Sequence, residues 1–461
     1  MRRISIVVCL LASFTLLNAC SGGRPYDGDA GRSAAYEPGL PSFDLEAVAT
    51  VQDGEPGVEV YVSFPRASLV FAATDTGYVA RYDLTMQIRG DDGRGTASFT
   101  SFGDTLVVAS TEAARTFERV RHDERFILPP GDYVVETTLE DLSTGEQAVR
   151  RQRVEVRDRT GPPWLSRPLI VAPSSDSSVE PVVSLHVPER RDSLRVQIGA
   201  YGSVGGASLD IAVSALRADT TVATPPFWIT PSRGSLLYRG IDEGVTDTLF
   251  ASRVPLAEQS EETVTVRLPP LATGIYRVDA RLRSATGQLL DQQGRLLSVK
   301  GTAFPQLATL AELVAALDYI AYPREMAFIT DGETPDERRR RFDAFWGALV
   351  SDRRVASNLL RLYFERVEEA NLLFTSHKLG WKTDRGMVYI VFGAPGFVER
   401  TFEGEVWHYG YGEEAASTFV FERADYYGAQ RALQHFVLVR QPVYERTWAR
   451  ALDRWRRGAA L

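Results

Sequence analysis

The sequence has very few cysteines and histidines, and each shortage excludes a kind of site. Its 461 residues include two cysteines and five histidines. Both cysteines, Cys9 and Cys20, lie within the first twenty residues, so no disulfide can staple the body of the chain. The histidines show no His-Glu-x-x-His or comparable ligand spacing. The sequence therefore predicts no metal site.

Lysine is also nearly absent. Lys300, Lys378 and Lys382 are the only lysines among 52 basic residues, so arginine supplies almost all the positive charge, as a GC-rich genome would cause. The formal net charge is −8, and removal of the first 19 residues, which hold Arg2 and Arg3 but no acid, changes it to −10. A net acidic chain is a poor ligand for nucleic acid, and we predict no such partner.

Signatures of catalysis are missing as well. The sequence contains no Gly-x-Ser-x-Gly elbow and no phosphate-binding Walker lysine. Residues 410–415 match G-x-G-x-x-A loosely, but they lie among expected hairpins and not in a strand–helix–strand unit. No nucleophile is paired with a base. We therefore predict no catalytic residue and no cofactor, and the chain is more easily understood as a protein that is not an enzyme.

The N-terminus is typical of an exported lipoprotein. Arg2 and Arg3 precede an apolar run of about fourteen residues, Ile4 to Leu17, which is too short to span a bilayer as a helix. Leu17-Asn18-Ala19-Cys20 then resembles a lipobox, which predicts a signal peptide over 1–19 and lipidation of Cys20 by acyl chains such as palmitate. Ser21, in place of Asp, resembles the Gram-negative sorting signal for the outer membrane, and we expect the protein on its periplasmic face. The alternative is an ordinary secretory signal.

The next 280 or so residues indicate β-structure. Residues 20–41 are rich in Gly, Ser, Pro and Asp and are expected to form a flexible tether. From Phe43 onward, apolar and polar residues alternate, as in Val58 to Phe64 and Tyr78 to Met86, a period typical of half-buried strands. We expect no helix of useful length before about residue 305.

An internal repeat divides this β-rich half. Gly131, Tyr133 and Leu139 recur as Gly274, Tyr276 and Leu282, each 143 residues later, and in both copies a Pro-Pro pair precedes and a Thr-Gly turn follows. The pattern predicts a closing hairpin in each of two tandem immunoglobulin-like all-β sandwiches, over 42–160 and 164–301. Chance similarity of two hairpins is the alternative.

The C-terminal part, 305–461, predicts an α+β domain with helices followed by an antiparallel sheet. Capping boxes at Thr309 and Thr334 begin two helices, and a third runs from about Val355 to Lys378, with Gly380 ending it as a C′ glycine. Strands are then expected at 387–392, 405–409, 418–422 and 435–439. A last helix carries Trp448, Leu452 and Trp455 on one face, which we expect to pack on the core.

The third helix is followed by a distinctive run, Gly380-Trp381-Lys382-Thr383-Asp384-Arg385-Gly386. It resembles the signature of the GWxTD-domain family of bacterial lipoproteins, and the resemblance covers roughly residues 305–440. It implies an architecture and an envelope location but no reaction. A weaker likeness, carried by Gly393, Pro395, Trp407 and Tyr409, links the chain to small lipoproteins of the outer-membrane assembly machinery.

Two interpretations of the signature remain open. In the structural one, Gly380 caps the helix, Trp381 fills the corner, Asp384 accepts bonds from the turn and Gly386 supplies a positive φ. In the functional one, polar side chains line a ligand cleft: Thr383, Asp384 and Arg385, with Arg366 and Asn371 from the preceding helix. Burial of Asp384 and Trp381 distinguishes the two.

Three classes of function follow. The first is a non-catalytic lipoprotein that binds envelope proteins, as a subunit or a scaffold, while its N-terminal lipid holds it on the membrane. The second is a glycan- or peptidoglycan-contacting protein that uses Trp407, Tyr409 and Tyr411 as an aromatic platform. The third is an enzyme centred on Asp384.

Overall fold

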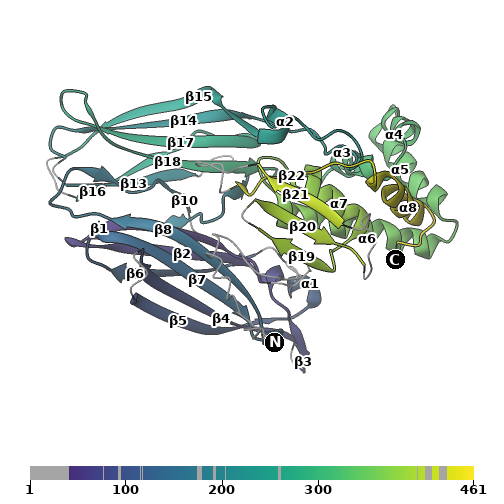
Figure 1. The fold of residues 1–461 in the computed structure, drawn as a ribbon, viewed down its shortest axis with the longest axis horizontal. Coiled ribbons are helices and arrows are strands. Elements are labelled where there is room, and N and C mark those ends of the chain that lie inside the picture. The colour runs from purple at the N-terminus through teal and green to yellow at the C-terminus, as the bar shows by residue number, and fades with distance from the viewer. Residues whose placement is uncertain are drawn as a thin grey trace, which may run out of the picture.

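The computed structural model describes residues 41–460 except 76, 92–94, 115, 117, 174–178, 190–193, 203, 258–260, 402, 411–417 and 425–432. Cys20, the expected tether and Tyr411 lie outside the described residues. The described chain is mostly β-sheet, and its helices gather toward the C-terminus (Figure 1). None of the described helices is both long enough and apolar enough to span a membrane.

Two packed sheets form the first part of the chain. One sheet has the strand order β1-β2-β6, and the other has the order β3-β4-β7-β8 with β5 paired to β4. Alternate residues face a shared core, so Val58, Val60 and Val62 of β2 and Tyr82 and Leu84 of β4 are completely buried. The bounds are β1 Asp44–Gln52, β2 Glu55–Pro65, β3 Ala72–Thr74, β4 Gly77–Gly90, β5 Thr96–Val108, β6 Arg119–Ile127, β7 Gly131–Asp141 and β8 Glu146–Val156, with short helices η1 Arg66–Ser68 and α1 Thr111–Ala114.

A second pair of sheets follows the seam at 161–164. One has the order β11-β10-β13-β16 with β9 paired to β13, and the other has the order β12-β18-β17-β14-β15. The bounds are β9 Trp164–Leu165, β10 Leu169–Pro173, β11 Val179–Pro181, β12 His186–Pro188, β13 Arg195–Tyr201, β14 Ser208–Ala218, α2 Leu236–Arg239, β15 Ile241–Pro255, β16 Glu261–Arg267, β17 Gly274–Arg283 and β18 Leu289–Lys300.

The internal repeat corresponds to a repeated structure. β7 pairs with β8 and β17 with β18, both as antiparallel hairpins, which confirms the two expected hairpins. The repeated tyrosines also bond alike: the Tyr133 hydroxyl donates to the Pro129 carbonyl at 2.9 Å, and the Tyr276 hydroxyl donates to the Ala272 carbonyl at 2.8 Å. Each hydroxyl therefore ties its strand to the backbone four residues upstream.

The two sheet pairs contact one another through charged and apolar groups. Glu46 of β1 is buried and lies 3.3 Å from Arg295 and 3.3 Å from Arg167, both of the second pair. Val48 packs with Leu169 and Val171 beside them. The two halves of the β-rich region therefore share a contact that is both charged and apolar.

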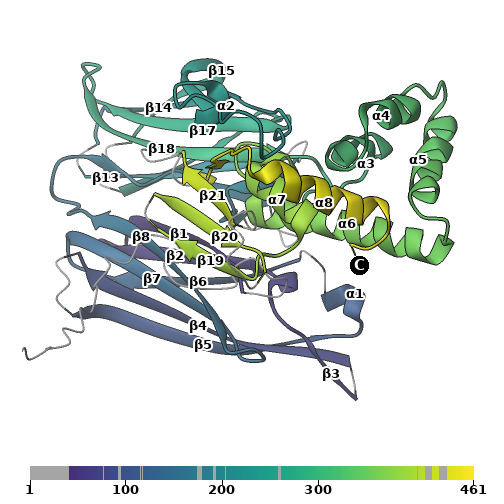
Figure 2. The same cartoon turned by 45° about the vertical axis from the view of Figure 1, so that its right-hand side comes forward.

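Helices and a small sheet form the rest of the chain, with the sheet lying between the helices and the β-rich region (Figures 1 and 2). The sheet order is β19-β20-β21-β22, and one large aromatic core joins it to the helices. The bounds are α3 Leu310–Ala315, η2 Ala316–Tyr319, α4 Pro323–Thr330, α5 Pro335–Leu349, α6 Arg353–Phe374, η3 Gly380–Lys382, α7 Asp384–Phe392, β19 Phe397–Arg400, β20 Gly404–His408, β21 Thr418–Arg423, β22 Phe436–Leu438 and α8 Tyr444–Arg456.

Several expected helix features are present. Thr309 and Glu312 form the complete capping box of α3. Thr334 caps α5, but the Glu337 side chain accepts from the amide of Glu333 and not from that of Thr334, so the second box is only half made. Trp448 and Trp455 of α8 are buried in the core, as expected for a docked helix. Helix α4 and strand β19 were not predicted.

The expected strand at 387–392 is wrong. This apolar run belongs to α7, because the Thr383 hydroxyl accepts from the Gly386 amide as an N-cap and the core surrounds the helix on all sides. A short run of buried apolar residues carries no period that separates a strand from a buried helix. Gly393, with φ 86°, ends the helix, since its amide donates to the Tyr389 carbonyl.

Candidate functional site

The signature residues form a tight corner between α6 and α7. Helix α6 ends at Phe374, so Gly380 does not serve as its C′ residue and instead begins η3. A Cβ built on Gly380 would lie 1.8 Å from the Ala370 carbonyl oxygen of α6. The glycine is therefore required for a close approach of two backbones, and the expectation of a helix-ending glycine is wrong.

Gly386 has the same kind of role. It lies inside α7 with an ordinary helical backbone, so the expected positive φ is wrong. A Cβ at Gly386 would lie 1.9 Å from the Gly380 carbonyl oxygen. Thr383 links the same residues, because its hydroxyl donates to the Gly380 carbonyl at 2.7 Å while it accepts from the Gly386 amide at 3.0 Å. The two glycines and the threonine form one close-packed unit.

Asn371 and Trp381 complete the inner side of the corner. Asn371 is completely buried; its Oδ1 accepts from the Trp381 amide at 3.1 Å and its Nδ2 donates to the Pro305 carbonyl at 2.8 Å. Trp381 is 2 % exposed, and its backbone carbonyl accepts from the Tyr319 hydroxyl. Both amide groups of Asn371 therefore serve the backbone, and neither faces a cleft.

Asp384 makes a buried ion pair with Arg440, which follows β22. The guanidinium engages the carboxylate with both terminal nitrogens, at 2.7 and 3.1 Å, and the Leu438 amide donates to the same carboxylate at 2.7 Å. Asp384 is only 9 % exposed. Sequence reasoning missed Arg440, which lies 56 residues away and belongs to no motif.

The side chains of the two remaining candidates, Arg385 and Arg366, contact other groups than Asp384. Arg385 is buried, with its guanidinium 4.1 Å from the Phe436 ring centroid, 3.6 Å from Glu405 and bonded to the Gln434 carbonyl. Arg366 donates to the Ile390 carbonyl at the far end of α7 and lies over the Trp455 ring. The structure therefore brings Thr383, Asp384 and Asn371 to one corner but does not assemble the proposed polar cleft with Arg366.

A long connection between β14 and β15 covers this corner. We name residues 219–240, which include α2, the strap. Its backbone bonds directly to the signature region: the Ala223 amide donates to the Lys382 carbonyl at 3.0 Å, and Arg440 donates to the Thr224 carbonyl at 3.1 Å. A hairpin connection of this length exceeds the usual two to five residues. The strap is thus a part of the second sheet pair that is built into the C-terminal domain.

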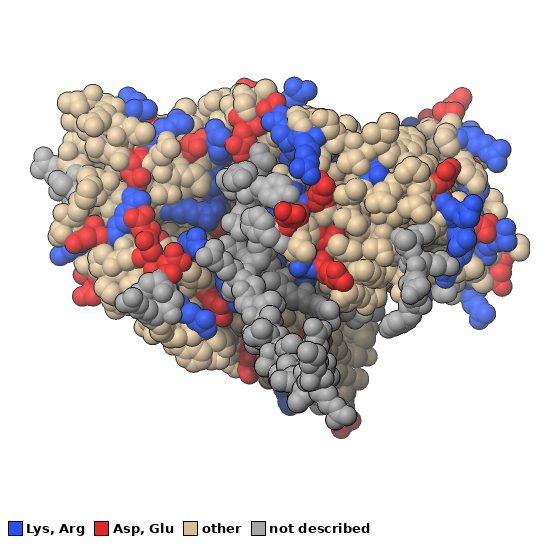
Figure 3. Space-filling model, in the orientation of Figure 1, with Lys and Arg blue, Asp and Glu red and all other residues tan. Residues whose placement is uncertain are grey.

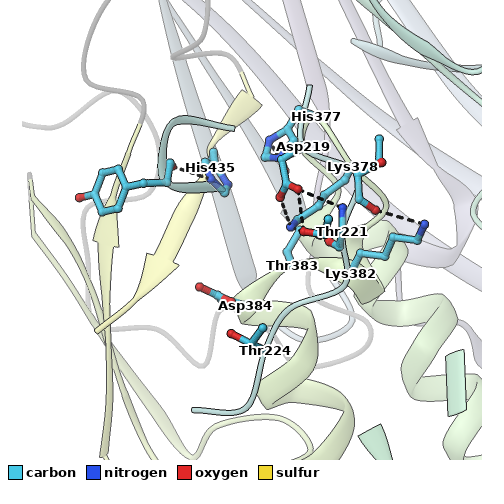
Figure 4. A network of polar contacts seen from close by, with 12 residues as sticks. Asp219, Thr221, Thr224, His377, Lys378, Lys382, Thr383, Asp384 and His435 are labelled. Carbon is cyan, nitrogen blue, oxygen red and sulfur yellow. Dashed lines mark hydrogen bonds and ion pairs between the residues drawn. The ribbon is translucent and has the colours of Figure 1, made fainter. Parts of the chain in front are cut away.

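All three lysines of the chain lie where the strap contacts the C-terminal domain, and Figure 4 shows Lys378 and Lys382 there. Lys378 is paired with Asp219 at 2.6 Å and also donates to the Thr221 carbonyl. Lys300, at the end of β18, donates to the carbonyls of Ser376 and His377 at 3.2 and 3.4 Å. Burial, together with the charge of Lys382, lowers the pKa of Lys300 to about 7.

Two buried histidines lie in the same junction. The His377 and His435 rings are 4.4 Å apart, edge to face, and the strap residue Gly240 packs against both. His435 Nε2 lies 3.1 Å from the strap carbonyl of Tyr238. Burial lowers the pKa of His435 to about 4 and that of His377 well below its usual value. We name the four buried residues Lys300, Lys378, His377 and His435 the junction cluster.

The chemistry available at the corner and junction is limited. Among the described residues, no group of three metal-binding side chains comes together. The carboxylates of Asp384 and Asp219 are each held by a cation, which suits structural pairing better than proton abstraction. The scarcity of lysine was the one sequence signal that could have located the junction, because three rare residues converge there.

The fold and this corner define a helical module with a small antiparallel sheet, docked on β-sheet pairs through a strap. Residues 284–457 match the family model of the GWxTD domain, so this part of the chain is a GWxTD domain. The match begins between β17 and β18 and therefore includes Lys300 of the junction.

Comparisons with other proteins are less informative. No curated protein matches the chain. Among solved structures, it is similar to red sea bream transglutaminase (11 % identity, TM-score 0.18, 57 % of this chain and 32 % of that one). It is also similar to Escherichia coli alpha-2-macroglobulin (12 % identity, TM-score 0.20, 57 % and 16 %). The chain spans a third or less of either protein, and TM-scores this low support no argument.

Proposed function

We propose that this chain is a non-catalytic lipoprotein of the cell envelope that acts as a binding scaffold. Its lipid is attached at Cys20 and holds it on the outer membrane, periplasmic face. Two immunoglobulin-like sandwiches and the GWxTD domain contact one another and present surfaces to envelope proteins. The tyrosine hydroxyl bonds of Tyr133 and Tyr276 support the immunoglobulin-like assignment, because this fold commonly ties such a tyrosine to upstream backbone.

One observation carries the non-catalytic part of the proposal. The polar groups of the signature are committed to internal contacts: Thr383 caps α7, Asp384 is neutralised by Arg440, and Arg385 is buried against Phe436. A catalytic carboxylate needs access to a substrate, and Asp384 is buried beneath the strap. The signature thus serves as the joint that orders α6, α7 and β22.

The glycan-contacting alternative receives less support. Trp407 is completely buried against Phe374 and Phe421, and the Tyr409 hydroxyl donates to the Gly393 carbonyl. An aromatic platform for sugars needs exposed ring faces. Trp407 cannot supply one.

The test is crosslinking and affinity capture from intact envelopes with the wild-type chain, with Cys20→Ala and with Asp384→Asn as matched variants. We expect specific envelope proteins to be captured by the wild type, and Cys20→Ala to lose membrane attachment. Turnover of a cell-wall or peptide substrate by the purified chain would contradict the proposal if Asp384→Asn abolished it without lowering the melting temperature. Normal processing and membrane retention of Cys20→Ala would contradict the anchoring.

A further inference from the structure

The strap exposes an apolar pair that folding does not require. The chain has seven tryptophans, all within the described residues, and six of them are at most 5 % exposed. The seventh, Trp228, is 56 % exposed, and its neighbour Ile229 is 92 % exposed. Large apolar side chains left in water at consecutive positions contribute little to the core and commonly mark a contact surface.

The backbone around this pair is held firmly. Phe227 packs against the core, and the Trp228 amide donates to the Pro225 carbonyl in a turn. On one side of the pair, the Gln441 amide donates to the Pro226 carbonyl at 3.1 Å, and on the other, the Arg440 amide donates to the Thr230 hydroxyl at 2.8 Å. The exposure is therefore built into the fold and is not the result of a loose loop.

Charge around the pair favours an anionic or neutral surface. Residues 220–241 contain no acidic residue, although the chain has 60, and they contain two arginines, Arg233 and Arg239, both exposed. Glu422 is paired with Arg233 at 3.0 Å, and Asp219, just before the segment, accepts from the Thr221 hydroxyl at 2.6 Å. In Figure 3 the surface around α3 and the chain leading into α2 is largely uncharged, and beside α2 basic side chains lie next to acidic ones.

We infer that Trp228 and Ile229 insert into the headgroup region of a lipid bilayer and orient the lipoprotein on its membrane. Tryptophan prefers the membrane–water interface, where its ring is buried while its N–H stays hydrated, and isoleucine favours the hydrocarbon below. Exposed arginines attract anionic headgroups.

The inference rests on the proposed function, because a lipid at Cys20 keeps the bilayer near. Covalent geometry limits residues 21–40 to a span of at most about 70 Å. Because the anchor keeps the protein within this distance of the bilayer, the effective concentration of membrane around the strap is high. Even a weak contact of Trp228 and Ile229 with lipid is then formed much of the time.

Trp228 provides its own reporter. We would produce residues 20–461 directly, without the signal peptide and with Cys20→Ser so that no lipid is attached, and mix them with vesicles of phosphatidylcholine with or without phosphatidylglycerol. Because the other six tryptophans are buried, subtraction of the Trp228→Phe spectrum isolates Trp228. We expect a blue shift, quenching by lipids brominated in the acyl chain, and stronger partitioning with phosphatidylglycerol. Ile229→Ser should weaken partitioning about threefold or more, whereas Val245→Ser, an exposed apolar residue of β15, should leave it unchanged.

Absence of both the shift and the quenching at any vesicle composition would overturn the inference. The inference would also be wrong if Val245→Ser weakened partitioning as much as Ile229→Ser. A third contradicting result is that an envelope protein, and not lipid, shields Trp228 from a soluble quencher. Anchoring is tested separately by flotation of the lipidated wild-type chain with vesicles. Loss of flotation with intact Trp228 quenching would contradict the proposed anchor and leave the strap contact standing.

Discussion

At the scale of single residues, the GWxTD signature is a packing solution. The two glycines lie where backbones approach too closely for any side chain, and the threonine, asparagine and aspartate each bond to backbone or to an internal cation. Because the threonine, asparagine and aspartate of the corner are all bonded internally, changes there should affect stability before they affect anything else.

Gly386→Ala is the sharpest test of this packing. The added Cβ would meet the Gly380 carbonyl at 1.9 Å, and backbone must move to make room, so we expect a loss of about 3 kcal/mol in the free energy of unfolding. Gly347→Ala in α5 is the matched control, because nothing lies within 4 Å of its Cβ. That change should stabilise the protein by about 0.5–1 kcal/mol. Denaturant unfolding measures both; equal effects would contradict the close approach.

The buried ion pair gives a second residue-scale prediction. Asp384→Asn leaves the Arg440 guanidinium buried without a counter-charge, which should cost about 3–5 kcal/mol. Asp343→Asn breaks an exposed pair with Arg339 on α5 and should produce no measurable change. The melting temperatures of the two variants provide the comparison. A stable Asp384→Asn variant that had lost partner capture would show that the carboxylate serves binding instead.

At the scale of elements, the sequence predicts strands and capped helices well where a local pattern exists. The alternating strands, the two repeated hairpins and the capping box of α3 each follow from residues near one another in the chain. The sequence predicts a strand at 387–392 in place of helix α7. Nearly every residue of this run is buried, so the sequence shows neither the period of a half-buried strand nor that of an amphipathic helix. A local pattern cannot report what surrounds an element.

The strap was not predictable from sequence for a related reason. Residues 219–240 carry no period of their own, and their structure comes from contacts with the corner about 150 residues later. The same holds for the partner of Asp384, which lies beyond the sheet. Thr383, Asp384 and Asn371 lie together at the corner and Arg366 does not, because the partners of each side chain depend on tertiary contacts.

The strap is expected to depend on one buried pair. Asp219→Asn removes the counter-charge of Lys378, so residues 219–240 should exchange their amide hydrogens at least about tenfold faster, a change worth about 1.4 kcal/mol of local opening. Asp210→Asn on β14 is the matched control, because it alters a carboxylate paired with Arg253 and Arg283 outside the strap. Faster exchange throughout the chain, rather than in the strap, would contradict a local role.

At the scale of the whole molecule, the junction cluster makes the modules depend on one another. Lys300 belongs to the second sheet pair, Lys378 and His377 to the segment after α6, and Asp219 and Gly240 to the strap. The same burial that joins these parts opposes positive charge on the histidines. A single solution variable, pH, should therefore act on the joint.

We expect the protein to lose stability as the pH falls from about 6.5 toward about 4. The pKa of His435 is about 4 in the folded chain and near 6.5 when unfolded, and burial also lowers that of His377. In this window the unfolded chain binds protons that the folded chain does not, so stability rises with pH. By pH 5 the lowered pKa of His435 should have cost on the order of 2 kcal/mol of stability, and the lowered pKa of His377 acts in the same direction.

The charges facing the histidine pair bear on the direction of this effect. Lys378 and Lys300 lower the pKa of His377, and Lys378 and Arg385 lower that of His435. Asp384 and the bond to the Tyr238 carbonyl raise the pKa of His435. Protonation would thus add charge to a group that is already cationic. Thermal melts between pH 8 and 4.5 measure the slope, which His377→Gln combined with His435→Gln should reduce. His408→Gln, on β20 outside the junction, should leave the slope unchanged, and an equally steep slope in the double variant would place the pH sensitivity elsewhere.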